Sequence, residues 1–214
     1  NGEVPTSSTA GAIPFTNPSG GNLSYIAHGV ATGTLTGTIV LYDRLWHNSG
    51  FVGNVTTAQT ISTPPTLTRP DSLGADVELW LEVYTAMGST ASTFTATYTD
   101  QDGNTSQSAT YSHPANALTV GQMARFELAA GDTGVRSVSQ VQLSISTGTA
   151  GNFGLVLLRR IAEIPIPSAN AGLSLDTFSL GLPQVYDNAC LAMMLFCSST
   201  NTGTWMGSFS LAQG

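Results

Sequence analysis

The sequence predicts an all-β protein: an antiparallel β-sandwich of jelly-roll type, with few or no helices and an extended N-terminal arm. Many short runs alternate apolar and polar residues, which is the period of a half-buried strand. Clusters of Gly, Pro, Asn and Asp separate these runs and indicate turns. No stretch sustains the i, i+3, i+4, i+7 spacing of apolar residues over three helical turns. At 214 residues, this pattern suits one large sandwich domain.

The beginning of the chain differs in pattern from the rest. Pro5, Pro14 and Pro18 stand among Ser, Thr and Gly without periodicity. Proline removes a ladder donor and holds the preceding residue extended. We therefore predict an extended arm over residues 1–21 and a β-sandwich domain over residues 22–214. Because the arm has few large apolar side chains, we expect it to dock on a neighbouring subunit, and its deletion to leave thermal stability nearly unchanged.

Alternation locates the individual strands. We predict strands over residues 23–31, 35–45 and 77–85. Asp102-Gly103 lies between two alternating runs and predicts a hairpin over residues 92–111, because a type I′ turn needs positive φ at both central residues. We also predict two further hairpins, one from strands 138–147 and 153–161 and one from strands 190–198 and 204–211. Residues 168–182 are predicted as an irregular crossover or a short helical turn.

The charge content narrows the classes of partner. Charged residues make up 9% of the chain and Lys is absent, whereas ordinary soluble domains have roughly 25%. A net charge of −7 and a pI near 4.6 argue against nucleic acid and against anionic membranes as partners. No run approaches the ~20 apolar residues of a membrane span. A surface rich in Thr and Ser is easily buried against another protein, because few ions need desolvating.

Two acidic motifs resemble functional sites, one of them catalytic and the other metal-binding. Asp132-Thr133-Gly134 is the tripeptide of aspartic proteases, but that chemistry needs two such carboxylates and the tripeptide occurs once. The segment 100–104 offers alternate oxygen atoms, as a calcium loop does, yet Tyr111 stands where such a loop needs Glu. We predict a surface turn for the first and a hairpin turn for the second.

The histidines predict no site either. His28, His47 and His113 lack the spacing of zinc ligands, and the chain has no nucleophile-elbow motif. A hydrolase triad assembled only in space is left open. We therefore predict no catalytic, cofactor-binding or metal-binding residues and no cofactor.

The cysteines and tryptophans each have two interpretations. Cys190 and Cys197 would lie roughly 23 Å apart in one strand, too far for a disulfide, which needs Cα atoms within about 7 Å. We predict two buried thiols that are not bonded to each other, and an intermolecular disulfide is the alternative. Trp46, Trp80 and Trp205 are predicted to fill the core or an interface; the alternative is an aromatic platform for sugars.

Three stretches together are similar to a known family. They read LYDRLWHNSG at residues 41–50, AGDTGVRSV at 130–138, and YDNACL at 186–191 with the terminal AQG at 212–214. These stretches resemble virion structural proteins of tailed bacteriophages, associated with the head. The resemblance spans most of the chain from about Ile39 onward. Its motifs carry no catalytic role, so no functional residues are transferred.

The resemblance implies a non-enzymatic protein that decorates or cements the outer surface of a phage capsid. Its partners would be the major capsid protein or another virion protein, and it would form a homo-oligomer, with a trimer favoured. A place in the tail or a fibre stays open, as a β-sandwich that binds carbohydrate.

Overall fold

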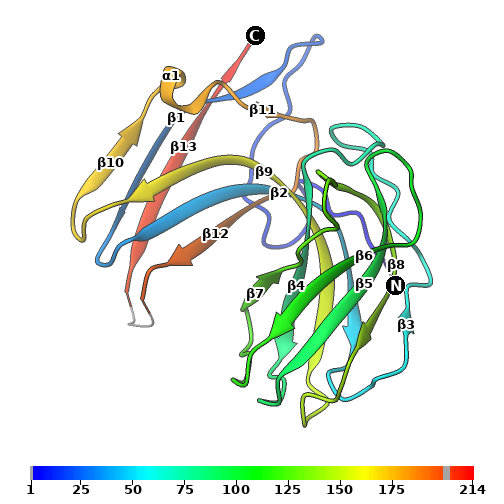
Figure 1. The fold of residues 1–214 in the computed structure, drawn as a ribbon. Coiled ribbons are helices and arrows are strands. Elements are labelled where there is room, and N and C mark those ends of the chain that lie inside the picture. The colour runs from blue at the N-terminus through cyan, green and yellow to red at the C-terminus, as the bar shows by residue number, and fades with distance from the viewer. Residues whose placement is uncertain (1, 200–202) are drawn as a thin grey trace. The chain divides into compact units, whose positions relative to one another are not determined.

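The computed structural model describes residues 2–199 and 203–214 of the chain. Within these residues it contains thirteen strands and one four-residue helix, and the strand pairs whose register is resolved are antiparallel (Figure 1). The prediction of an all-β antiparallel protein with few helices is confirmed. The finer jelly-roll topology stays a prediction.

The contacts divide the chain into two compact units. Unit 1 comprises Asn1–Pro5 and Arg44–Arg159, and unit 2 comprises Thr6–Asp43 and Arg160–Gly214. The boundary falls within two long strands, so each of them contributes residues to both units. No linker or composition shift marks this division in the sequence, because the same two strands supply both units.

Unit 1 has two sheets with a hydrophobic core formed by both. The first belongs to a five-stranded sheet of order β12-β2-β9-β4-β7. Unit 1 contains β4 (Val77–Thr85), β7 (Met123–Arg125) and parts of β2 (Gly37–Phe51) and β9 (Asn152–Ile166) from this sheet. The second has the order β3-β8-β5-β6, with bounds β3 (Gln59–Thr60), β8 (Val135–Leu143), β5 (Ser92–Asp100) and β6 (Gln107–His113). The predicted strand at 77–85 is confirmed as β4. Its alternation buries Val77, Leu79, Leu81 and Val83 in this core.

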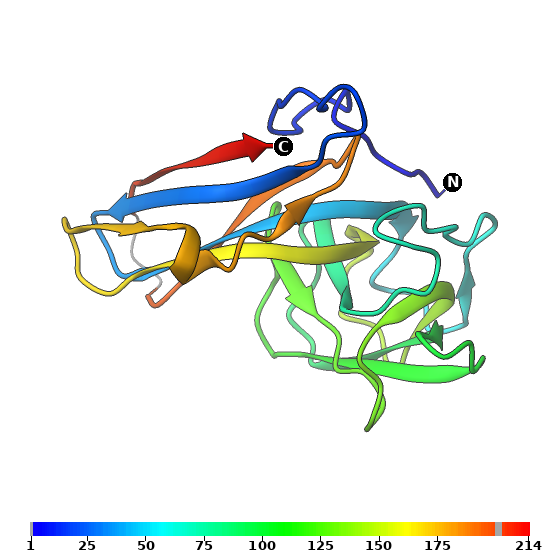
Figure 2. The same ribbon diagram turned by 90° about the horizontal axis from the view of Figure 1, so that it is seen from above.

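Unit 2 also has two sheets. One is centred on β1, which β10 and β11 flank on one side and β13 along its whole length on the other. Its strands are β1 (Ser24–Gly33), β10 (Gly172–Leu175), β11 (Gln184–Val185) and β13 (Trp205–Gln213). Figure 2 shows β13, β1 and β10 side by side in that order. The other is the same five-stranded sheet of order β12-β2-β9-β4-β7, to which unit 2 contributes β12 (Leu191–Cys197) and the remaining parts of β2 and β9.

The predicted crossover at residues 168–182 contains strand β10 and the helix α1 (Thr177–Leu180). The Asp176 side chain caps the helix by accepting a hydrogen bond from the Ser179 amide, and Gly181 ends it in the left-handed conformation. These are the preferred residues for the two ends of a helix. The helix is a single turn because Asp176 caps its start and Gly181 ends it four residues later.

The hairpin around Gly103 is confirmed, but its predicted turn type is wrong. β5 pairs with β6 from Ser92 opposite His113 to Tyr98 opposite Gln107. The connection is longer than two residues, and Gly103 and Ser106 have positive φ while Asp102 does not. The longer loop is held by a side chain, because the Asp100 carboxylate accepts hydrogen bonds from Asp102 N at 2.9 Å and from Asn104 N at 2.8 Å.

These hydrogen bonds also set the acidity of Asp100. Desolvation raises its pKa, but the hydrogen bonds from Asn104, Asp102 and Gly103 outweigh that effect, and the net pKa lies below the ordinary value. The loop is therefore built around an ionised carboxylate, which protonation at low pH would weaken.

We predict that Gly103→Val destabilises this loop. Gly103 has a φ of 86°, which a β-branched residue resists, and a Cβ there would lie 3.3 Å from Arg136 Nη1. The expected loss is about 1–3 kcal/mol of unfolding free energy, measured by thermal and urea denaturation. Gly103→Asn is the matched control, because Asn tolerates positive φ. Equal stability of the wild type and the Val variant would contradict the turn assignment.

The two other predicted hairpins are wrong. β8 pairs with β5 and β3, whereas β9 pairs with β4. Likewise β12 pairs with β2, whereas β13 pairs with β1. In each case the connection leads from one sheet to another. Of the tip predicted at residues 199–203, residues 200–202 lie outside the described residues. A short loop can join two strands of one hairpin or two strands of different sheets. The alternation of apolar and polar residues within the strands is the same in the two cases, so the sequence does not distinguish them.

The predicted arm packs on its own chain. Glu3 exchanges two backbone hydrogen bonds with His47, at 2.8 and 3.0 Å, and the buried Arg69 donates to the Pro5 carbonyl at 3.0 Å. Further along, the Ile13 amide donates to the Leu191 carbonyl at 2.8 Å. Except for the isolated bridge at Glu3, the described part of the arm has no strand, as its prolines predict. These hydrogen bonds hold the arm against its own chain.

Candidate functional site

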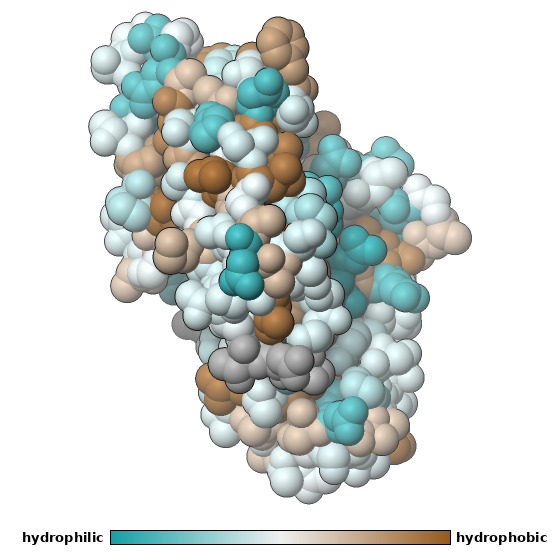
Figure 3. Space-filling model, turned by 90° about the vertical axis from the view of Figure 1, so that its left-hand side faces the viewer, coloured by the Kyte–Doolittle hydropathy of each residue, from teal (hydrophilic) through white to brown (hydrophobic). Residues whose placement is uncertain are grey.

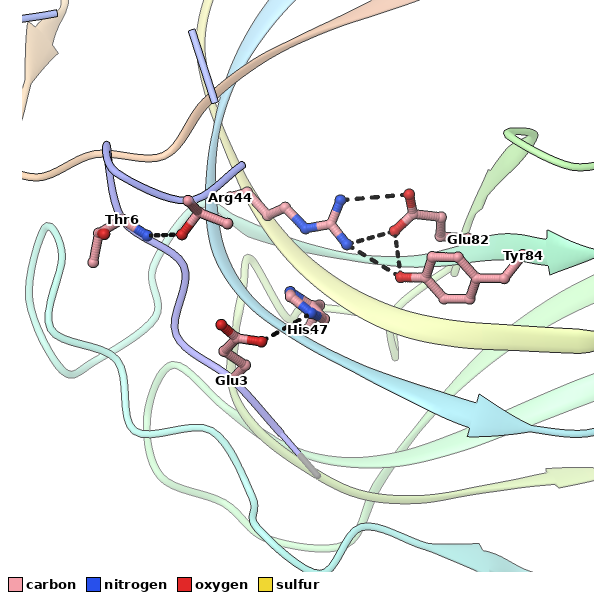
Figure 4. Close-up of polar contacts among 7 residues, drawn as sticks. Glu3, Thr6, Arg44, His47, Glu82 and Tyr84 are labelled. Atoms are coloured by element: carbon pink, nitrogen blue, oxygen red, sulfur yellow. Dashed lines mark hydrogen bonds and ion pairs between the residues drawn. The ribbon is translucent and has the colours of Figure 1, made fainter. Parts of the chain in front are cut away.

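A cluster of charged and aromatic side chains lies on β2 and β4 of unit 1 (Figure 4). Arg44 donates through Nη2 to Glu82 Oε2 at 2.5 Å and to the Tyr84 hydroxyl at 3.2 Å. Tyr84 in turn donates to Glu82 Oε2 at 2.7 Å. Burial, first, and then the hydrogen bond to Glu82 raise the pKa of Tyr84 to about 12. Hydrogen bonds thus join the three groups, while the buried Arg44 Nε has no hydrogen-bond partner among the described residues.

His47 extends this cluster toward the arm. Its Nε2 lies 3.6 Å from the Glu3 carboxylate, and the same two residues form the backbone bridge. Burial and then the charge of Arg44 lower the pKa of His47, although Glu3 and Glu82 act in the opposite sense. The lowered pKa favours a neutral imidazole, and the backbone hydrogen bonds between Glu3 and His47 fasten the arm to β2. The cluster therefore holds the start of the arm in place.

The other histidines lie apart from His47. His28 hydrogen-bonds Ser174 on β10 at 2.8 Å, and the buried His113 hydrogen-bonds the Gly88 carbonyl at 2.9 Å. Across residues 2–199 and 203–214, no three side chains of His, Cys, Asp or Glu gather in a way that could hold a metal ion.

The aspartate of the protease-like tripeptide has a structural partner. Asp132 accepts a hydrogen bond from the Tyr98 hydroxyl, and the amides of Thr133 and Gly134 both donate to Gln101 Oε1 at 3.1 Å. Burial and the hydrogen bond to Asp132 raise the pKa of Tyr98 to about 12. The tripeptide is thus a turn fastened to β5 and to the Gly103 loop, as predicted.

The tryptophans do not form an exposed platform. Trp46 and Trp80 are 1% and 4% exposed, and Trp80 donates to Glu78 Oε2 at 2.8 Å. Trp205 is half-buried and donates to the Leu35 carbonyl at 3.2 Å. The prediction that they fill the core is confirmed for Trp46 and Trp80. The three tryptophans therefore do not offer the exposed aromatic platform on which the sugar-binding alternative depended.

The two cysteines are not joined to each other, as predicted. Cys190 is buried and its amide donates to the Asp43 carboxylate at 2.9 Å. The prediction that both thiols are buried is wrong for Cys197, which is exposed at the end of β12. That strand end is exposed because β12 is the last strand of its sheet.

Two strands of unit 2, β12 and β13, each have an edge that is not paired with another described strand. We call these two edges, with the space between them, the open side. β12 ends its sheet, and β13 pairs with β1 on one side. Among the described residues no strand pairs with the other edge of either. Natural edge strands are usually protected by charges, prolines or bulges. Neither β12 nor β13 contains a charged residue or a proline.

An apolar groove runs between these two strands. Its two parts have volumes of about 250 and 260 Å³, and Met193 and Gly207 line both. Leu191 and Leu195, on the same face of β12 as Met193, pack into hydrophobic clusters, whereas Met193 is 49% exposed. Gly207 has no side chain to close the groove opposite it. Met193 therefore points toward the interior between the two sheets, but it is half-exposed because no side chain covers it from β13.

The arm covers one end of this groove. Ile13, Pro14 and Phe15 line the part next to Leu191 and Leu211. The part lined by Ile39, Met194 and Trp205 has no arm residue in its wall. The arm thus closes the sandwich at one end and leaves the other end of the open side uncovered.

The chain segment that contains β12 and β13 carries no charge. Residues 188–214 contain no Asp, Glu, Lys or Arg, although the chain as a whole has a net charge of −7. The exposed side chains here include Met193, Phe196 at 37% and Met206 at 65%. Figure 3, which views the molecule from the left-hand side of Figure 1, shows brown hydrophobic side chains among pale ones of intermediate hydropathy and some teal hydrophilic ones.

Sequence reasoning missed the open side. The charge-free stretch at 188–214 was visible in the sequence and was the one available signal for it. That signal gained its meaning from the structure, which shows both strands at sheet edges. None of the described helices is long and apolar enough to cross a membrane. Comparison with protein-family models, curated proteins and solved structures finds no match to this chain.

Proposed function

We propose that this protein is a non-enzymatic structural component of a bacteriophage particle. It decorates or cements the outer surface of the head through contacts with the major capsid protein or another virion protein. The observation that supports this role is the open side of unit 2, where uncharged edge strands flank an apolar groove. Exposed apolar surface rimmed by polar residues is typical of protein-interaction sites. The resemblance of residues 41–50, 130–138 and 186–191 to head-associated proteins supplies the partner class.

The rest of the surface fits the same role. A surface of hydroxyl and amide side chains is desolvated at low cost, which favours a protein that covers a repeating lattice by many weak contacts. The buried tryptophans give no support to carbohydrate binding, so we retain one function.

The test is co-sedimentation with capsids that lack this protein. We expect the wild type to sediment with assembled heads to a saturating, fixed ratio of copies to capsid protein. It should not bind equally to dissociated capsid protein, because a lattice site is built from several subunits. Heads saturated with the protein should also resist heat or chelators better than bare heads. Absence of binding to heads, with binding to tails or to cell-surface sugars instead, would refute the proposal.

A further inference from the structure

We propose that the uncovered part of β12 pairs with β12 of a second copy, antiparallel and about a two-fold axis. This inference rests on the proposed assembly role and names one of its partners, the chain itself. It is carried by the open side, the backbone geometry of β12 and the distribution of charge.

The backbone shows which groups of β12 are available. The Leu191 carbonyl accepts from the arm amide of Ile13, so it points away from the sheet. The Ser198 amide donates to Thr36 beyond the end of β2, so it points into the sheet. Backbone groups alternate in direction along an antiparallel strand. The next outward groups after Leu191 are therefore those of Met193, Leu195 and Cys197.

The arm demonstrates that this edge accepts an extended chain. Its hydrogen bond to Leu191 has the geometry of a strand paired with β12. Beyond this hydrogen bond the arm does not continue along the edge. The three outward residues form a symmetric set, with Leu195 at its centre. Antiparallel pairing of two copies places Leu195 opposite Leu195, and Met193 opposite Cys197 of the other copy. All three outward residues on each strand then exchange hydrogen bonds.

The distribution of charge allows a second copy to approach this edge. A chain of net charge −7 repels its own copies wherever carboxylates meet, and residues 188–214 carry none. Pairing of a strand with itself needs no complement other than its own edge, and a two-fold contact is closed and does not propagate.

The first measurement is the mass of the full chain in solution. We expect twice the chain mass of 22.1 kDa at micromolar concentration. The double substitution Met193→Lys and Cys197→Lys places like charges opposite each other in both symmetric pairs. We expect it to raise the dimer dissociation constant at least about tenfold. Val120→Lys with Phe178→Lys is the matched control, since both positions are exposed and neither belongs to β12.

The second measurement tests the register. In the Met193→Cys variant the introduced thiol faces Cys197 of the other copy, at a Cα separation of about 5.5 Å, which a disulfide can bridge. Within one strand these two positions are about 13 Å apart and cannot bond. Mild oxidation should therefore yield a covalent dimer that joins the introduced thiol to Cys197, found by peptide mass mapping. The dimer should vanish when Cys197→Ser is added, and Met206→Cys should form none.

Three results would overturn the inference. They are a monomer at all concentrations, an oligomer that the double Lys variant leaves unchanged, and a trimer in which oxidation of the Met193→Cys variant gives no linkage to Cys197. Each is distinguishable from failure of the proposed function, because capsid co-sedimentation of the wild type is measured separately. A monomer that binds heads would keep the function and remove the pairing.

Discussion

Phe94→Ala is expected to lower the free energy of unfolding by about 3–5 kcal/mol. Phe94 is fully buried on β5, and its ring lies edge-on to Phe153 at a centroid distance of 5.3 Å. It also contacts the rings of Tyr111 and His113, at 5.9 and 5.8 Å. Removal of the ring leaves a cavity where residues of both sheets of unit 1 meet. The measurement is urea denaturation followed by circular dichroism and tryptophan fluorescence.

The control for this substitution is Thr93→Ala, the next residue on the same strand. Thr93 is exposed, so its loss should change stability by less than about 0.5 kcal/mol. The two variants differ only in which face of β5 they alter. A cost below about 1 kcal/mol for Phe94→Ala would show that this aromatic cluster is not the centre of the unit 1 core.

Deletion of residues 1–16 is expected to cost about 3–5 kcal/mol of stability, contrary to what the composition of the arm predicts. The deletion removes the Pro5 carbonyl that accepts from buried Arg69, and an unsatisfied buried donor costs about 1–3 kcal/mol. It also removes Ile13 and Phe15 from the hydrophobic cluster of unit 2, at about 1 kcal/mol each for partly buried side chains. Thermal denaturation and hydrogen exchange of β12 amides measure the two effects.

Point variants separate these contributions. Ile13→Ser with Phe15→Ser should destabilise unit 2 while leaving the Arg69 contacts in place. Val4→Ser is the control within the arm, because Val4 is 38% exposed. If the deleted protein unfolds at the wild-type temperature, the arm does not stabilise its own subunit, and docking on a neighbour becomes the better description.

The sequence by itself determined the features that depend on neighbours along the chain. The alternation of Val77, Leu79, Leu81 and Val83 defines β4 and its buried face, because successive side chains of a strand point to opposite sides. Gly103 marks a turn because its conformation is unfavourable for other residues. The absence of a Cys190–Cys197 bond follows from their separation along one extended segment. Each of these conclusions needs only local geometry.

The tertiary structure alone decided which strands are partners and which edges stay open. β8 and β9 are neighbours in the chain yet pair in different sheets, and so do β12 and β13. Pairing depends on contacts between residues far apart in sequence, which the period of each strand does not encode. The half-exposed Met193 shows the consequence. Its apolar side chain predicts a core position, and its exposure results from the arm ending its contact with β12 at Leu191 and from Gly207 leaving the opposite wall bare.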